Sequence, residues 1–181
     1  LCFVGQDTFQ AGRTAAGLMG EMTGGSGQVA IISGQVANPG LISRQKGFST
    51  EIKESFPGIE VVDTRYSYDD EWVASKIVEE LLELYPELTG IYITGHGVKG
   101  VCQTLQKLGK DKTMHVIAKD FLEENLKWLK EGTINFLIGQ DAAVQGHSPV
   151  TILFQLLFDN KTPEKEYQYT DIVIRTKYNM G

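Results

Sequence analysis

The residues of this sequence best suited to chemistry are polar and charged side chains that come directly after short apolar runs. Arg44, Asp120 and Lys119 supply a planar guanidinium, a carboxylate and an ammonium group, and most of the others supply amides or hydroxyls. Such groups donate and accept hydrogen bonds without reacting, which suits a small, hydroxyl-rich ligand. The candidate ligand-binding residues are Gln6, Gln35, Asn38, Arg44, Tyr68, Asp69, His96, Lys119, Asp120 and Gln140.

Sequence motifs for catalysis, metal binding or a cofactor are missing from the chain. GGSG at 24–27 lacks the GK[ST] ending of a phosphate loop and precedes an apolar run instead of following one. The chain has no GxSxG elbow and no HExxH helix, and no two of His96, His115 and His147 have metal-ligand spacing. We therefore expect a binding protein without metal or cofactor. The alternative is an enzyme on a doubly wound sheet that uses His96 with Asp120.

Apolar runs typical of strands alternate with amphipathic segments typical of helices along the whole chain. Connections this short require a parallel sheet covered by helices on both faces, and such sheets bind ligands beyond the carboxyl ends of their strands. The expected fold class is thus a three-layer α/β fold. The expected strands span 28–34, 59–66, 90–94, 114–120, 133–139 and 171–176, and the expected helices span 8–22, 39–56, 70–85, 98–108, 123–130 and 142–158.

One nine-residue pattern occurs twice, as VGQDTFQAG at 4–12 and IGQDAAVQG at 138–146. In both copies a strand ends at Gly, and Asp7 or Asp141 stands where a helix N-cap belongs. Gln6 and Gln140 precede the caps, where their amides would project toward a ligand at the strand end. The copies are too far apart for a tandem repeat.

A series of ordered segments resembles the type I periplasmic sugar-binding proteins and the effector domains of the lactose-repressor family. The segments include VGQDTFQAGRTAA, NPGLISRQKGF, TGIYIT, VIAKD and LKEGTINFLIGQD. The resemblance implies two lobes joined by three chain crossings, with a sugar bound between them. It places residues 8–135 and 171–181 in the C-terminal lobe, residues 141–167 in part of the N-terminal lobe, and the crossings near 4–7, 136–140 and 168–171.

The resemblance also suggests roles for several candidate residues. Arg44 of the R-x-x-G-F pattern is expected to fork onto sugar hydroxyls, with Asn38 one turn earlier, and Asp120 to accept two hydroxyls. For Asp120 the alternative is a helix cap. Lys119 departs from the usual residue there, so if it faces the cleft, an acidic or phosphorylated ligand becomes plausible. His96 stands where the family usually has an Asn-Asp pair.

The neighbouring YSYDDEW segment at 66–72 contributes the remaining candidates. Tyr68 is a candidate for stacking on a sugar face, and Trp72 a weaker one. Asp69 and Asp70 are adjacent and point in different directions. We expect one of them to cap the following helix and the other to enter the cleft.

From the resemblance we expect the effector-binding domain of a lactose-repressor-type regulator in the cytoplasm. The alternative is a solute-binding protein of a sugar transporter, outside the cytoplasm. The net charge of −6 and the scattered basic residues argue against DNA binding by this segment itself, so operator DNA would be bound through an N-terminal headpiece.

The two ends of the chain and the apolar helix at 142–158 suggest partners. The opening LCFVG reads as a strand already under way, so we expect a piece of a longer protein, and no apolar run is long enough to span a membrane. The helix at 142–158 would lack part of its covering sheet. A patch of this kind favours self-association, and we expect a homodimer.

Overall fold

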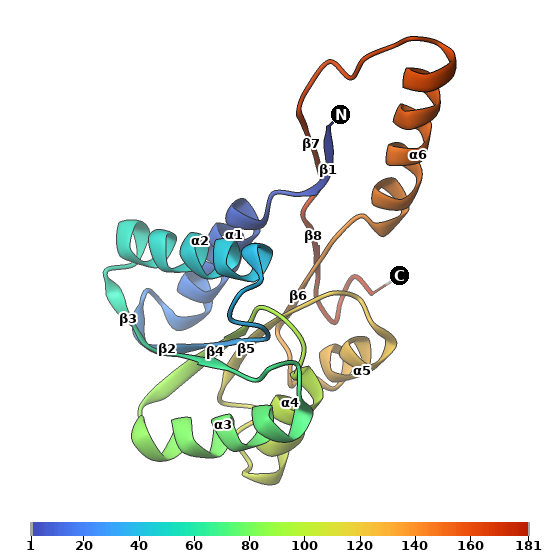
Figure 1. The fold of residues 1–181 in the computed structure, drawn as a ribbon. Helices are drawn as coiled ribbons and strands as arrows, with labels where there is room; N and C mark the ends of the chain where they lie inside the picture. Colours follow the sequence, from blue (N-terminus) through green and yellow to red (C-terminus); the bar gives the residue numbers. More distant parts are fainter. Residues whose placement is uncertain (1, 181) are drawn as a thin grey trace.

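The computed structural model describes residues 2–180, which fold into strands and helices that alternate along most of the chain (Figure 1). The strands are β1 (Phe3–Gln6), β2 (Ser26–Ser33), β3 (Gly58–Tyr66), β4 (Leu88–Ile93), β5 (His115–Lys119), β6 (Phe136–Gly139), β7 (Tyr167–Thr170) and β8 (Val173–Arg175). The helices are α1 (Thr8–Thr23), α2 (Pro39–Ser55), α3 (Glu71–Leu84), α4 (Val98–Lys107), α5 (Glu123–Glu131) and α6 (Ala142–Phe158).

The main sheet has six strands in the order β3-β2-β4-β5-β6-β8. The first five strands run parallel, and β8 pairs antiparallel with β6. From β2 the chain moves outward to β3 and then back across to β4, so the direction of winding reverses between β2 and β4. In open α/β sheets this reversal opens a crevice at the carboxyl ends of the strands.

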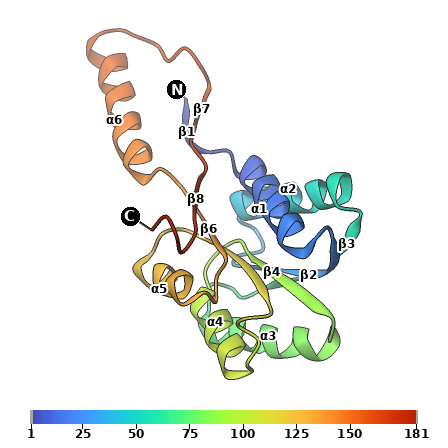
Figure 2. The same cartoon turned by 180° about the vertical axis from the view of Figure 1, so that it is seen from behind.

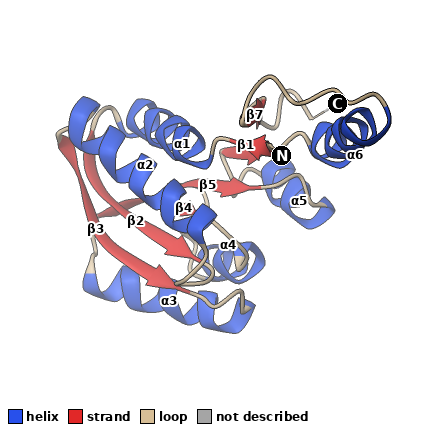
Figure 3. Cartoon of the chain, turned by 45° about the horizontal axis from the view of Figure 1, so that its top comes forward, coloured by secondary structure: helices blue, strands red, loops and turns tan. Residues whose placement is uncertain are grey.

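Helices cover both faces of this sheet, as Figures 1 and 3 show. Alternate residues of each strand point to opposite faces. Ile117 therefore packs with residues of α1 and α2, whereas Val116 and Ala118 pack with residues of α3, α4 and α5. Lys119, two residues after Ile117, comes next on the α1–α2 side of the strand. This gives the three-layer α/β architecture expected from the sequence.

α6, β1 and β7 stand apart from the main sheet (Figures 1 and 2). β1 and β7 form a separate parallel pair in which Gln6 lies opposite Thr170. α6 has no buried residue, although its sequence is strongly apolar. These three elements therefore form a unit separate from the main sheet. Within residues 2–180, little covers the apolar side chains of α6.

The expected helices and strands agree with the observed ones to within a few residues at each end. Two features differ. β7 was not expected, because YQYT has no apolar run and the strand is held only by its pairing with β1. β8 runs antiparallel in a sheet expected to be parallel, because the chain leaves the sheet through β6 and re-enters it in the reverse direction.

Aspartate caps explain where three of the helices begin. Asp7 accepts a hydrogen bond from the Gln10 amide, and Asp141 accepts one from the Val144 amide, as the repeated pattern predicted. Asp70 caps α3 by accepting from the Val73 amide, which leaves Asp69 as the member of the pair that is free to face the cleft. No helix within residues 2–180 is long and apolar enough to cross a membrane.

Candidate functional site

A cavity of about 360 Å³ lies at the carboxyl ends of the strands, where the winding of the sheet reverses. Its wall is built from the segments that follow β2, β3, β4 and β5 and from the first turns of the helices after them. Six sequence candidates contribute to it, namely Asn38, Arg44, Asp69, His96, Lys119 and Asp120.

Arg44 reaches this cavity from α2 and is buried, with 8% of its surface exposed. Asn38 fixes the start of that helix by accepting hydrogen bonds from the Gly40 and Leu41 amides. The buried Arg44 Nε has no hydrogen-bond partner among residues 2–180. Burial lowers the pKa of the guanidinium, although Arg44 remains charged at neutral pH. It is therefore a buried donor group with hydrogen-bonding capacity to spare.

Lys119 and Asp120 occupy the same cavity at the end of β5. Lys119 is 3% exposed, and its Nζ lies 3.9 Å from Asp120 Oδ1. Burial, together with the charge of Arg44, lowers the pKa of Lys119 to about 7, against the opposing effect of the Asp120 charge. The alternative that Lys119 points outward is therefore excluded.

Asp120 adopts the left-handed backbone conformation, with φ 64°. Such strain in a residue other than glycine is more common at functional sites. Its Oδ1 accepts a hydrogen bond from Gln140 Nε2 at 3.1 Å. The N-cap residue of α5 is Leu122, and this helix has no side-chain cap, so Asp120 does not serve as the helix cap considered in the sequence.

The other four candidates lie outside the cavity wall. Gln140 acts on it through Asp120, and Gln35 through Asp69, to whose Oδ2 it donates at 3.0 Å. Gln6 is buried and donates to the Gly139 carbonyl. Tyr68 is 59% exposed and lies in a neighbouring groove with Trp72.

Sequence reasoning missed a second group of cavity residues, which come from the first turns of α3, α4 and α5. Glu71 accepts a hydrogen bond from the Gly100 amide, and Lys99 pairs with Glu124 at 3.4 Å. The sequence gives only part of the signal for this group. In a parallel sheet the helix that follows a strand begins at the same edge, but which side chains of its first turn reach the cavity depends on how the helix packs. The residues of this group include Glu71, Lys99, Glu124 and Asn125.

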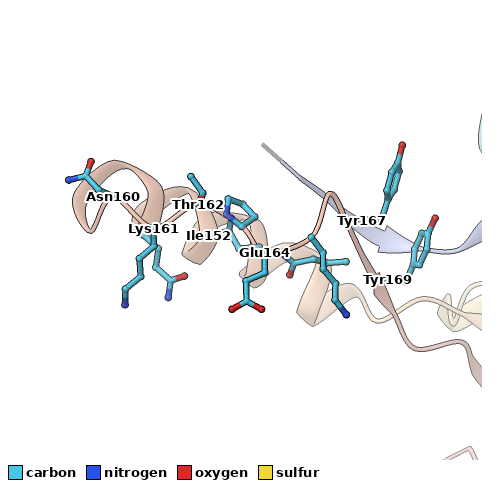
Figure 4. A pocket seen from close by; sticks show the side chains of 11 residues that line it. Ile152, Asn160, Lys161, Thr162, Glu164, Tyr167 and Tyr169 are labelled. Carbon is cyan, nitrogen blue, oxygen red and sulfur yellow. The ribbon is translucent and has the colours of Figure 1, made fainter.

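A larger hollow, of about 950 Å³, lies between α6 and the segment that leads to β7. Figure 4 shows that its labelled side chains come from α6 (Ile152), from the segment after it (Asn160 and Lys161 among others) and from β7 (Tyr169), and that they do not converge on one point. One of its walls is the uncovered α6. We therefore place the candidate site in the smaller cavity, where charged groups converge.

Within residues 2–180, no group of three or more His, Cys, Asp and Glu side chains could hold a metal ion. The cavity is thus a set of fixed donors and acceptors, built from amide, carboxylate, guanidinium and ammonium groups. Such a set can bind and orient a polar ligand.

The chain belongs to the periplasmic binding protein domain family, whose pattern matches residues 1–161. Its architecture is that of the type I periplasmic binding proteins. A comparison with curated protein sequences gives no match.

Three solved structures illustrate the similarity. A solute-binding protein of an ABC transporter from Burkholderia graminis, in complex with D-arabinose, is 32% identical with a TM-score of 0.91. AraP, an arabinose-binding protein from Geobacillus stearothermophilus, is 27% identical with a TM-score of 0.90. A sugar-binding protein of a sugar ABC transporter from Bacillus halodurans is 28% identical with a TM-score of 0.92.

Each structure covers 99% of this chain, and the chain spans 63, 64 and 65% of their respective lengths. All three of these structures are described as binding proteins. They support the transport alternative more strongly than the transcriptional regulator expected from the sequence.

Proposed function

We propose that the chain is part of the solute-binding protein of a sugar ABC transporter and that it binds a sugar in the cavity of Arg44, Lys119 and Asp120. The observation that carries the proposal is the buried Arg44 side chain, which lines the cavity and whose Nε has no hydrogen-bond partner among residues 2–180. A guanidinium can donate two parallel hydrogen bonds to neighbouring oxygens. An adjacent carboxylate accepts from hydroxyls, so the two groups together match a sugar edge.

The proposal includes the two lobes and three crossings expected from the resemblance. Contacts between distant segments support it. Gln6 donates to the Gly139 carbonyl at 2.9 Å, and Gln145 contacts both Gln140 Oε1 and Thr170 Oγ1 at 3.4 Å. Three connections bonded side by side would make a hinge. The repeated pattern would then reflect two similar crossings of that hinge.

In this proposal the residues that line the cavity form one side of a cleft. The other lobe, of which residues 141–167 are a part, supplies the opposite side. A ligand that contacts both walls stabilises the closed arrangement of a pre-existing open and closed equilibrium. The membrane transporter would recognise the closed form. The protein would work outside the cytoplasm, and it would not bind operator DNA.

Calorimetric titration of the full-length protein with D-arabinose, D-ribose, D-glucose, D-galactose and the uronates and phosphates of the two hexoses tests this function. We expect saturable binding of at least one carbohydrate and a loss of about tenfold or more in affinity for Arg44→Met, because a charge-assisted contact disappears. Arg13→Met is the matched control, since Arg13 pairs with Glu51 and Glu54 away from the cavity. Failure to bind any carbohydrate would overturn the proposal.

Fractionation of cells that express the full-length protein separates transport from regulation. A transport receptor is expected in the envelope or secreted fraction. Recovery in the cytoplasm together with specific retardation of DNA would favour the regulator instead.

A further inference from the structure

In the buried part of the cavity wall, positively charged groups outnumber negatively charged ones. Arg44 and Lys119 are both more than nine-tenths buried and carry positive groups. Asp120 is the one carboxylate within ion-pair distance of Lys119, and Arg44 has no ion-pair partner among residues 2–180. Two buried cations therefore share a single acid.

Burying a cation is costly unless an opposite charge compensates it. The contact between Lys119 Nζ and Asp120 Oδ1, at 3.9 Å, is long for a charge-assisted hydrogen bond. The same carboxylate oxygen also accepts from Gln140, and the Asp120 side chain is 44% exposed. Asp120 therefore compensates the two cations only in part, as the lowered pKa values of Arg44 and Lys119 also indicate.

Within residues 2–180, none of the remaining acids of the cavity wall lies within ion-pair distance of Lys119 or Arg44. Glu71 accepts from the Gly100 amide, Glu124 pairs with Lys99, and Asp69 accepts from Gln35. Among the acids of the wall, the charge of Asp120 is the one that acts on the pKa of Lys119. Within residues 2–180, the two buried cations therefore have one nearby carboxylate between them.

We propose that the ligand is a carbohydrate with an acidic substituent, a carboxylate or a phosphate, and that Lys119 selects for this group. The inference rests on the sugar-binding function proposed above. The acidic substituent supplies a second negative charge beside Lys119 and Arg44, while the sugar hydroxyls retain Asp120 as their acceptor. With a neutral sugar, the buried Lys119 ammonium keeps only the partial compensation that Asp120 provides.

The test compares matched ligands on the full-length protein by calorimetry. Each of D-glucose and D-galactose is titrated beside its uronate and its terminal phosphate, and D-arabinose beside its terminal phosphate. We expect one acidic member to bind at least about tenfold more tightly than its neutral parent, the gain of a charge-assisted hydrogen bond. A preference for the uronate identifies a carboxylate ligand, and a preference for the phosphate identifies a phosphorylated one.

Lys119→Met tests whether this residue causes the preference. We expect the variant to fold, since it replaces a buried charge with an apolar chain of similar length, and to lose the preference for the acidic ligand by about tenfold. Lys119→Gln provides a second variant, and thermal unfolding checks both. Lys76→Met is the control, because Lys76 is half-exposed, pairs with Glu79 and lies outside the cavity.

Three results would overturn the inference. Tighter or equal binding of the neutral sugars shows that the site needs no acidic group. An unchanged preference in both folded Lys119 variants shows that another residue selects it. Absence of binding by every neutral and acidic carbohydrate removes the proposed function itself, and the inference with it.

Discussion

Asp120 is the cavity residue whose charge can be removed with the least change of shape. Asparagine has the same size, tolerates the left-handed conformation and keeps an oxygen to accept from Gln140. We expect Asp120→Asn to weaken the binding of a neutral sugar about 10- to 100-fold, because a hydrogen bond to a charged acceptor contributes roughly 1.5–3 kcal/mol. Calorimetric titration measures the change.

Asp70→Asn is the matched control for this prediction. Asp70 caps α3, and asparagine is an equally good cap, so stability and sugar affinity should both stay close to the wild-type values. An equal loss of affinity in both variants would show that Asp120 acts through the fold and not through the ligand.

The burial of Lys119 predicts that the stability of the fold depends on pH. Burial lowers its pKa to about 7 in the folded protein, whereas an unfolded lysine titrates near pH ~10.4. Between these values the unfolded chain binds more protons at this residue, so the free energy of unfolding from this group rises with pH. The stability of the wild type relative to Lys119→Met should therefore increase from pH ~7 to ~10, by at most about 1.4 kcal/mol per pH unit.

Denaturant unfolding of both proteins across this pH range measures the difference. Comparison with the variant cancels the titration of all the other groups. A difference that stays constant across the range would mean that Lys119 titrates normally in the folded chain.

The sequence located the centre of the site better than its edge. Asp120 could be placed because the apolar run at 116–118 shows where a strand ends, and Arg44 because of the R-x-x-G-F resemblance. Glu71, Lys99 and Glu124 could not be placed in the same way. They reach the cavity only because α3, α4 and α5 pack at particular angles on one face of the sheet, and that packing is a tertiary property.

At the scale of elements, the close approach of α1 and α2 holds Arg44 in position. A Cβ added at Gly47 would collide with the Phe9 carbonyl, and one added at Gly12 would collide with the Arg44 carbonyl. The two helix backbones thus touch where glycine leaves room. Because Gly47 lies one turn after Arg44, a side chain at this point would push α2 away from α1.

We expect Gly47→Ala to destabilise the fold by about 1–3 kcal/mol, the usual cost of overpacking, and to weaken ligand binding because Arg44 moves with α2. Gly17→Ala is the control on α1, since nothing lies near its added Cβ. It should be neutral or stabilise by up to about 1 kcal/mol through helix propensity. Thermal unfolding and sugar titration distinguish the two, and similar behaviour of both variants would contradict the role of the close contact.

The elements that the sequence did not predict are those held by distant partners. β7 exists because Tyr167 to Thr170 pair with Phe3 to Gln6, more than a hundred residues away in the chain. The direction of β8 likewise depends on where the chain leaves the main sheet. Buried strands such as β2 and β4 could be predicted, since their apolar runs are a local signal.

At the scale of the whole molecule, α6 is an apolar helix without a cover. Its exposed side chains include Leu153 at 47%, Leu157 at 64% and Phe158 at 71%. The relatives are longer than this chain, and we propose that the remaining part of the second lobe covers this face in the full-length protein. Expressed alone, the 181 residues would leave an apolar patch in water, and such patches promote association.

We expect the isolated chain to self-associate and the double variant Leu153→Lys, Leu157→Lys to shift it toward the monomer, because two charges oppose burial of the patch. Sedimentation velocity over a range of concentrations measures the change. His147→Lys, an exposed polar position on the same helix, should leave association unaltered. A wild-type chain that stays monomeric at high concentration would contradict the prediction that the exposed apolar side of α6 drives self-association.

The same double variant has the opposite consequence if α6 is covered within the full-length protein. There Leu153 and Leu157 would lie inside a lobe, so the two lysines would bury charge and lower the stability by several kcal/mol instead of changing the association. Denaturant unfolding of the full-length protein measures this loss. Unchanged stability would mean that α6 stays exposed in the full-length protein and that its apolar face makes contacts between molecules. The two measurements together therefore show whether α6 is buried inside a lobe or forms an interface with another molecule.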